Sequence, residues 1–242
     1  EPHLNGRTVT WPRGRVLGGS SAINGLLYVR GQSQDYDVWR QLGNVGWSYE
    51  DVLPYFKRSE DQERGADDYH GAGGPLGVSD VRLPQNAMCE AFIDACEAAG
   101  IPRSNDFNGA KQEGAGYFQL TNRKGRRCSS AVAYLRPARA RPNLEIVTKA
   151  LVHGIELEGK RATGVRYERN GQVETIAAAR EVILAAGAIG SPQILQLSGI
   201  GPGAVLKAAG VPVRHELAGI GENLQDHLQV RFVYACTAKG SL

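Results

Sequence analysis

The spacing of apolar and polar residues predicts helices in the first half of the chain. Short helices are expected over 35–39 and 48–58, the second with Ser48 as its N-cap. Residues 61–87 are rich in Gly, Asp and Pro and show no periodicity, which predicts a loop. A further short helix is expected over 131–135.

The clearest helical pattern covers residues 87–99, where apolar residues recur on one face and Gly100 ends the pattern. The apolar positions are 88, 92, 95, 96 and 99. We therefore expect Met88, Cys89 and Cys96 to lie in the core rather than to bind a ligand.

The pattern changes after residue 140 to short apolar segments separated by turn residues, which predicts strands. Asn170-Gly171 is typical of a two-residue hairpin turn. Successive strands joined by such turns form an antiparallel meander. The expected strands are 144–148, 151–157, 162–168 and 173–177.

A continuous apolar run at 181–187 ends in small residues and predicts a strand buried on both faces of a parallel sheet. Ser191-Pro192 follows and predicts the start of a helix, with Ser as N-cap and Pro at the first helical position. Ligands of α/β folds bind at the carboxyl ends of such strands. The turn at 185–191 is therefore a candidate ligand-binding segment.

The composition is that of an ordinary globular protein, with 242 residues, 42% hydrophobic and 22% charged residues, and a net charge of +3. Two clusters of basic residues, 123–127 and 136–141, contain no interleaved aromatic residues and no recognisable reading helix. They predict solvated loops and helix ends, and they give no support to nucleic-acid binding.

The four cysteines show neither a CxxC motif nor metal-ligand spacing, which favours reduced thiols and predicts no zinc or other metal site. No apolar run approaches the roughly 18 residues of a membrane span. We therefore expect a cytoplasmic protein without a transmembrane segment, although attachment to the periphery of the inner membrane stays open.

The most unusual stretch is RGRVLGGSSAINGLLYVRG at residues 13–31, which contains five glycines with Ser20, Ser21 and Asn24 among them. Glycine inside regular structure costs roughly 0.5–1 kcal/mol relative to Ala, so such a cluster indicates backbone that bends sharply or approaches something closely. The chain thus has two candidate ligand-binding segments, here and at 185–191, which could meet at one cofactor.

These segments resemble the two signatures of the glucose–methanol–choline (GMC) family of flavin oxidoreductases. Residues 14–24 (GRVLGGSSAIN) are similar to the first signature, and residues 187–201 (GAIGSPQILQLSGIG) to the second. Residues 222–227 (ENLQDH) look like the family's run after the second signature. Nearly the whole chain is covered, and its detail is most similar to the choline dehydrogenase-like branch.

The resemblance implies FAD as the cofactor, with the first signature running along its pyrophosphate and flavin. The backbone N–H groups of such a stretch donate to the cofactor's oxygens, and glycine permits the close approach. Val152 matches the position whose backbone meets the adenine, and Ala186 and Gly187 are expected near the ADP half. The full set of implied cofactor-binding residues is Gly19, Ser20, Asn24, Gly25, Leu27, Val152, Ala186 and Gly187.

Ile23 occupies the position at which some GMC enzymes carry a His that binds FAD covalently. An alkyl side chain has no nucleophilic nitrogen, so the resemblance implies that FAD is held non-covalently.

The histidines do not form a catalytic arrangement in the sequence. Asp226 and His227 are adjacent, and neighbouring side chains of an extended segment point to opposite faces, so we interpret them as structural. The others lie in separate segments, where surface or hydrogen-bonded roles are expected; they are His3, His70, His153 and His215.

The implied fold is α/β (α+β), with a Rossmann-like FAD-binding domain that carries the meander, interleaved with a substrate domain built on an antiparallel sheet. We assign 1–48 (the glycine-rich flavin loop) and 141–225 to the FAD-binding portion, 49–140 to the substrate side, and 226–242 to the start of the substrate-domain sheet. The family's strand–GxGxxG–helix and its catalytic His segment are not recognisable here. We therefore expect a central portion of a longer enzyme, inactive alone, and name no catalytic residue.

The implied activity is FAD-dependent oxidation of choline or a similar small primary alcohol to the aldehyde, by hydride transfer to the flavin. Two alternatives stay open, an FAD-containing hydroxynitrile lyase of the same family and a non-catalytic FAD-binding remnant. The alcohol, the electron acceptor and the oligomeric state do not follow from the sequence.

Overall fold

The computed structural model describes residues 5–81, 87–227, 229–233 and 235. Within them the chain divides into two compact units, with the break between Leu144 and Glu145. This break lies close to the boundary expected at 140/141. The assignment of 1–48 and 141–225 to one FAD-binding portion stays a prediction.

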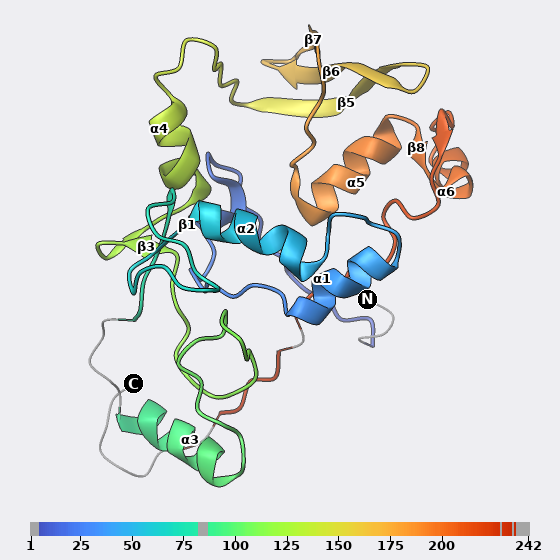
Figure 1. Cartoon of the computed structure of the whole chain (residues 1–242). Coiled ribbons are helices and arrows are strands. Elements are labelled where there is room, and N and C mark those ends of the chain that lie inside the picture. The colour runs from blue at the N-terminus through green and yellow to red at the C-terminus, as the bar shows by residue number, and fades with distance from the viewer. Residues whose placement is uncertain (1–4, 82–86, 228, 234, 236–242) are drawn as a thin grey trace. The chain divides into compact units, whose positions relative to one another are not determined.

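The described residues of the first unit form three helices of nine or more residues, α1 (Ser33–Gln41), α2 (Tyr49–Ser59) and α3 (Ala87–Ala98) (Figure 1). It also contains a 3₁₀ turn, η2 (Gly19–Ala22), and a π-helical segment, η3 (Ala131–Leu135), which continues into α4 (Arg136–Ala138). The helices expected at 35–39, 48–58 and 131–135 are thus confirmed.

Short-range hydrogen bonds explain why α2 begins where the sequence predicts. The Ser48 hydroxyl accepts from the Asp51 N–H at 3.3 Å, and the Asp51 carboxylate accepts from the Ser48 N–H at 3.0 Å, which forms a capping box. Tyr36 of α1 then packs against Phe56 of α2, with ring centroids 5.7 Å apart. The two helices therefore meet through an aromatic contact.

Residues 61–87, expected to be a loop, contribute to a small parallel pair of strands. β1 (Glu60–Gln62) pairs with β2 (Leu76–Val78), and Val78 is buried. Strands of three residues are too short to show periodicity, which is why the sequence did not reveal them. A second pair, β3 (Asn122–Arg123) and β4 (Arg126–Arg127), forms a tight hairpin.

Helix α3 exists as expected, but the prediction that Met88, Cys89 and Cys96 lie in the core was wrong. Met88 is 42% exposed and both cysteines are half-buried, whereas the buried residue is Ile93. Apolar periodicity marks a face that can be buried, but tertiary contacts decide which of its residues are. On either side of Ile93 in the sequence, Glu90 and Asp94 form ion pairs with Arg103 of the following segment, at 3.1 Å and 2.6 Å.

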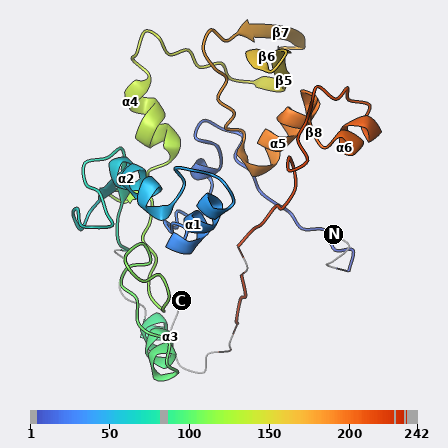
Figure 2. The same cartoon turned by 45° about the vertical axis from the view of Figure 1, so that its right-hand side comes forward.

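The second unit begins with the expected antiparallel meander, β5 (Ala150–Glu158), β6 (Arg161–Arg169) and β7 (Gln172–Ala177), in the order β5-β6-β7 (Figure 2). Asn170 and Gly171 have φ of 53° and 77°, the positive pair that a type I′ turn requires. No strand forms at 144–148, because no strand among the described residues pairs with this segment. Lys149, with φ 56°, separates it from β5.

Helix α5 (Gly187–Leu197) packs on β5 through the serine that follows it. The Ser198 hydroxyl donates to the Ile194 carbonyl at 2.6 Å and accepts from the Ile155 N–H at 2.8 Å. α5 begins four residues before the expected Ser191. The Ser191 hydroxyl therefore lies inside the helix, where it accepts from the Ala186 N–H at 3.0 Å. β8 (Ile200–Gly201), α6 (Gly203–Ala208) and β9 (His215–Glu216) follow, with β8 and β9 parallel.

The strand expected at 181–187 is absent, since residues 181–185 are irregular and Ile183 is 80% exposed. A central strand of a parallel sheet needs a hydrogen-bonded neighbour, and no strand in the described part of the chain pairs with this segment. Helices combined with small sheets are otherwise consistent with the expected α/β class.

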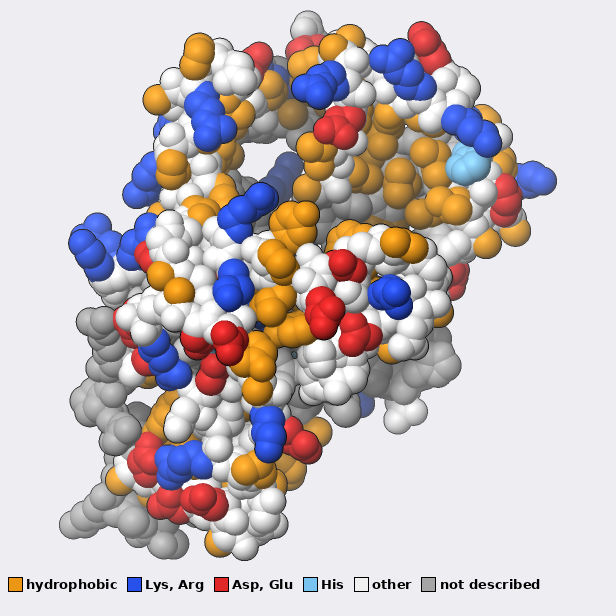
Figure 3. All heavy atoms as spheres, viewed as in Figure 1, with side chains coloured by type: hydrophobic (Ala, Val, Ile, Leu, Met, Phe, Trp, Pro, Cys, Tyr) orange, Lys and Arg blue, Asp and Glu red, His pale blue; other side chains and the backbone are white. Residues whose placement is uncertain are grey.

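The buried apolar core is small and many apolar side chains reach the surface, as the orange side chains in Figure 3 show. The buried apolar residues in the described part of the chain are Val78, Ile93, Cys128, Ala133, Ile194 and Leu206. Among the described residues, no helix has the length and apolar character needed to cross a bilayer. The same residues contain no cluster of side chains able to hold a metal ion.

Candidate functional site

The glycine-rich loop folds back on itself, and this requires Gly14. The Gly14 N–H donates to the Ser20 hydroxyl at 3.2 Å. A Cβ added to Gly14 would lie 2.1 Å from the Gly19 carbonyl oxygen, far inside contact distance. The sequence therefore places glycine here because no other residue lets the backbone approach so closely.

In the turn that follows, Gly18 and Gly19 adopt positive φ angles of 93° and 53°, in the left-handed region of backbone conformation. The Ser21 hydroxyl donates back to the Gly18 carbonyl and also accepts from the Ser130 N–H at 2.9 Å. A Cβ on Gly18 would lie 3.1 Å from the Ala131 Cβ, so the loop is packed tightly against the segment that begins the π-helix.

Five of the implied cofactor-binding residues lie on this loop and leave polar groups available. Within the described residues the N–H groups of Gly25 and Leu27 have no hydrogen-bond partner, and Leu27 is 54% exposed. The Asn24 side-chain oxygen accepts from the Leu26 N–H at 3.2 Å. The loop thus presents backbone donors and an apolar side chain together; its implied residues are Gly19, Ser20, Asn24, Gly25 and Leu27.

The end of the loop is anchored to a different segment. Leu26 adopts φ 68°, and its carbonyl accepts from the Thr121 N–H at 2.8 Å and the Thr121 hydroxyl at 3.1 Å. The Tyr28 N–H donates to the Gln119 carbonyl at 2.8 Å. These bonds fix the path of the backbone on which Gly25 and Leu27 are displayed.

The other three implied residues lie in the second unit. Val152 is half-buried on β5, just before a bulge in its register with β6. Ala186 is the N-cap of α5, and Gly187 begins that helix with φ 87° and open space around its Cα. Whether these residues meet the first five at one cofactor stays a prediction.

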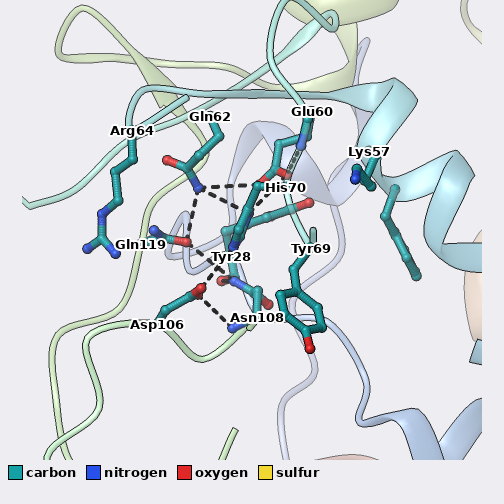
Figure 4. Close-up of polar contacts among 12 residues, drawn as sticks. Tyr28, Lys57, Glu60, Gln62, Arg64, Tyr69, His70, Asp106, Asn108 and Gln119 are labelled. Atoms are coloured by element: carbon teal, nitrogen blue, oxygen red, sulfur yellow. Dashed lines mark hydrogen bonds and ion pairs between the residues drawn. The ribbon is translucent and has the colours of Figure 1, made fainter. Parts of the chain in front are cut away.

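A buried polar cluster lies beside the loop in the first unit (Figure 4). The Glu60 carboxylate, fully buried, accepts from Arg30 Nη2 at 2.6 Å and contacts His70 Nδ1 at 3.0 Å. His70 Nε2 lies 2.9 Å from Asp106 Oδ2. Two cations thus face two carboxylates, which balances the buried charge.

The same contacts shift the pKa values of the cluster. The hydrogen bonds with Asp106 and then Glu60 raise the pKa of His70 to about 9, so both ring nitrogens carry protons at neutral pH. Burial alone would raise the pKa of Asp106, but the hydrogen bonds from His70 and the Asn108 N–H hold it below its ordinary value. His70 is therefore an imidazolium in a structural network and has no free nitrogen to act as a base.

Sequence reasoning gave His70 a surface or hydrogen-bonded role, and the hydrogen-bonded one is confirmed, but it missed the cluster. The one local signal is the alternation of Glu60 and Gln62, which places two polar side chains on the same face of a short strand. His153 contacts Glu168 at 3.2 Å, and His215 lies on β9. Asp226 and His227 are exposed, and His3 lies outside the described residues.

Comparisons with known proteins agree with the signatures. The chain matches the GMC oxidoreductase family model over residues 2–229. It is 50% identical over 239 residues to an oxygen-dependent choline dehydrogenase of Photobacterium profundum, covering 98% of this chain and 42% of that protein. A protein of the same name from Sinorhizobium fredii is 49% identical over 243 residues, covering 100% of this chain and 44% of that protein. The chain thus spans less than half the length of these relatives.

Solved structures show the same fold. Pyridoxine 4-oxidase from Mesorbium loti superposes with a TM-score of 0.86 at 37% identity, covering 92% of this chain and 44% of that one. An FAD-dependent oxidoreductase from Chaetomium thermophilum gives a TM-score of 0.85 at 34% identity, covering 92% and 41%. With its two signatures, its folded glycine loop and these matches, the chain belongs to the GMC family of oxidoreductases.

Proposed function

We propose that this chain is part of an FAD-dependent enzyme that oxidises choline or a similar small primary alcohol to the aldehyde. The observation that carries the proposal is the identity of about half to oxygen-dependent choline dehydrogenases over 98% of this chain. GMC oxidoreductases use FAD, and the two signatures of that family are both present here.

The loop in the first unit fits such a cofactor. Gly14 permits the fold of the backbone, and the N–H groups of Gly25 and Leu27 are unpaired within the described residues. Backbone donors of this kind suit the oxygens of a flavin or a pyrophosphate. Ile23 and Leu27, both about half exposed, would provide apolar contact for an aromatic ring system.

When bound, FAD would accept the hydride from the alcohol carbon. The residues of this chain would hold and orient the cofactor: Gly19, Ser20, Asn24, Gly25 and Leu27 at the flavin side, and Val152, Ala186 and Gly187 at the ADP side. Ile23 offers no atom for a covalent bond, so the cofactor would be held by hydrogen bonds and packing. We assign no catalytic residue to this chain.

The test is anaerobic addition of choline to the purified full-length protein. We expect a yellow protein whose visible flavin absorption disappears as the flavin is reduced. A yellow protein that is not bleached by choline or other primary alcohols would instead support a lyase or a non-catalytic FAD-binding protein. The relatives and structures named above are two dehydrogenases, an oxidase and an oxidoreductase, so the comparisons give the lyase alternative no support.

A further inference from the structure

The basic cluster at 123–127 does not behave as the solvated segment that its composition predicts. Arg123 Nη2 contacts Asp61 Oδ2 at 2.9 Å. Arg127, at the end of β4, reaches the glycine-rich loop instead. Its Nη1 donates to the Asn24 carbonyl at 2.7 Å, to the Asn24 side-chain oxygen at 2.7 Å and to the Ser21 carbonyl at 3.2 Å.

These contacts join residues that are more than 100 positions apart in the sequence, 103 for Asn24 and 106 for Ser21. Further bonds from the same segment act on the same loop. The Ser130 N–H donates to the Ser21 hydroxyl at 2.9 Å, and the Ser130 hydroxyl donates to the Gly18 carbonyl at 3.1 Å. Residues 127–131 therefore form a platform on which the turn of the loop rests.

The contact with Arg127 also fixes which way the Asn24 amide points. A guanidinium can only donate hydrogen bonds, and so can the Leu26 N–H that approaches the same atom at 3.2 Å. Both require the oxygen of the amide on their side. The NH₂ group is therefore directed away from them, and it has no hydrogen-bond partner among the described residues.

We propose that Arg127 is a positioning residue of the flavin site, which holds the turn at Ser21–Asn24 and orients the Asn24 amide so that its NH₂ donates to an acceptor atom of the bound flavin. The inference rests on the proposed function, since it takes FAD as the ligand. We assign Arg127 itself no contact with the cofactor. It acts through the loop, by satisfying carbonyl groups that would otherwise need water or a different backbone path.

Arg126 supplies the matched control. It precedes Arg127 on the same strand and carries the same charge, but it is exposed, and its side chain makes no hydrogen bond or ion pair within the described residues. A change at Arg126 therefore removes a charge from the same hairpin without touching the loop.

The experiment compares the full-length holoenzyme with R127M, R127K and the control R126M, with FAD itself as the probe. The FAD dissociation rate is measured by the recovery of flavin fluorescence on dilution, together with the visible absorption spectrum of the bound flavin and the melting temperature of each apoprotein. We expect R127M to release FAD about tenfold faster or more, because without the bonds from the charged Arg127 donor the loop leaves the conformation that binds FAD more often. R127K keeps the charge but not the planar donor group and should fall between.

In R127M we also expect an altered flavin spectrum and, because the lost bonds lie within the protein, an apoprotein melting temperature below that of R126M. Wild-type dissociation in R127M, or equally fast release from R126M, would overturn the proposal. If R127M does not fold, R127K takes its place: wild-type FAD dissociation in R127K, or equally fast release from R126M, would overturn the proposal. If the wild-type protein itself carries no FAD, the proposed function has failed rather than this inference.

Two substitutions at Asn24 test the orientation of its amide separately. N24A removes both the acceptor and the donor. N24D retains an acceptor for Arg127, and strengthens that contact by its charge, but has no donor for the flavin. We expect N24D to weaken FAD binding at least as much as N24A does. Wild-type FAD affinity in N24D would show that the NH₂ group is not the one that meets the cofactor.

Discussion

Removing the positive charge of His70 is expected to destabilise the first unit, because the imidazolium joins two carboxylates inside the protein. Its ring nitrogens lie 3.0 Å from Glu60 Oε1 and 2.9 Å from Asp106 Oδ2, and the side chain is only 3% exposed. These hydrogen bonds raise the pKa of His70 from 6.5 to about 9.

A raised pKa means that the folded state binds the proton more tightly than the unfolded state. The contribution to stability is therefore fully present below a pH of about 6.5 and is lost as the pH rises through about 9. At 1.36 kcal/mol for each unit between these two pKa values, protonated His70 contributes about 3 kcal/mol to the free energy of unfolding. This is a large part of the stability of an ordinary domain.

The assay is denaturant unfolding of the full-length protein and of H70Q at pH 6 and pH 10. We expect H70Q to lose about 3 kcal/mol at pH 6, and to differ from the wild-type protein by less than about 1 kcal/mol at pH 10, where the wild-type His70 has itself lost its proton. The control is H153Q. His153 also contacts a carboxylate, Glu168, at 3.2 Å, but both side chains are partly exposed, so we expect less than about 1 kcal/mol at either pH.

An equal loss of stability for H70Q at both pH values would contradict a role for the charge of His70. It would show that His70 contributes by packing or as a neutral hydrogen-bonding group, and that its charge carries none of the effect. If H70Q loses as little stability at pH 6 as H153Q does, the buried ion pairs of His70 contribute no more to the free energy of unfolding than a surface ion pair.

Three further predictions concern the loop, the cofactor and the chain itself. G14A should lower FAD occupancy and the free energy of unfolding, the latter by about 1–3 kcal/mol, because the added Cβ would lie 2.1 Å from the Gly19 oxygen. The control is G219A, where the added Cβ has open space around it. Full FAD occupancy in G14A would contradict the fold of the loop. Acid precipitation of the full-length holoenzyme should release yellow flavin into the supernatant, since Ile23 cannot bind it covalently; flavin retained in the pellet would show this alignment of the signature to be wrong. Residues 1–242 expressed alone should be poorly soluble and should show no cooperative melting transition in calorimetry, because apolar residues such as Ile183 and Val45 are 80% and 90% exposed. A sharp melting transition would contradict this prediction.

The features that the sequence predicts well depend on neighbours in the sequence. The capping box of Ser48 and Asp51 spans three residues, and the turn at Asn170-Gly171 depends on the backbone freedom of two. Five glycines within residues 13–31 predict a place of close backbone approach, and the approach of Gly14 to Gly19 confirms that interpretation.

What the sequence did not predict depends on contacts between distant residues. On α3 the buried residue is Ile93, and Arg103, which lies beyond the helix, contacts Glu90 and Asp94; the apolar pattern of the helix contains neither fact. The segment at 181–185 has the composition of a buried strand, but composition cannot show whether another strand lies beside it.

The site shows the same limit. His70 is 10 residues from Glu60 and 36 from Asp106, and no periodic pattern connects the three. Arg127 is 103 residues from Asn24, so its cluster of basic residues was interpreted from composition alone. In each case the partner becomes visible only when the chain is folded.

The glycine-rich loop is fixed by protein contacts at both ends, which bears on the thermodynamics of binding. Its turn rests on Arg127 and Ser130, and its far end is bonded to Thr121 and, through Arg30, to the buried Glu60. A loop that is already ordered loses little conformational entropy when a ligand arrives, so more of the interaction energy remains as affinity. A glycine loses more backbone conformational entropy on ordering than any other residue. In this loop that entropy is lost when the chain folds, before any cofactor binds.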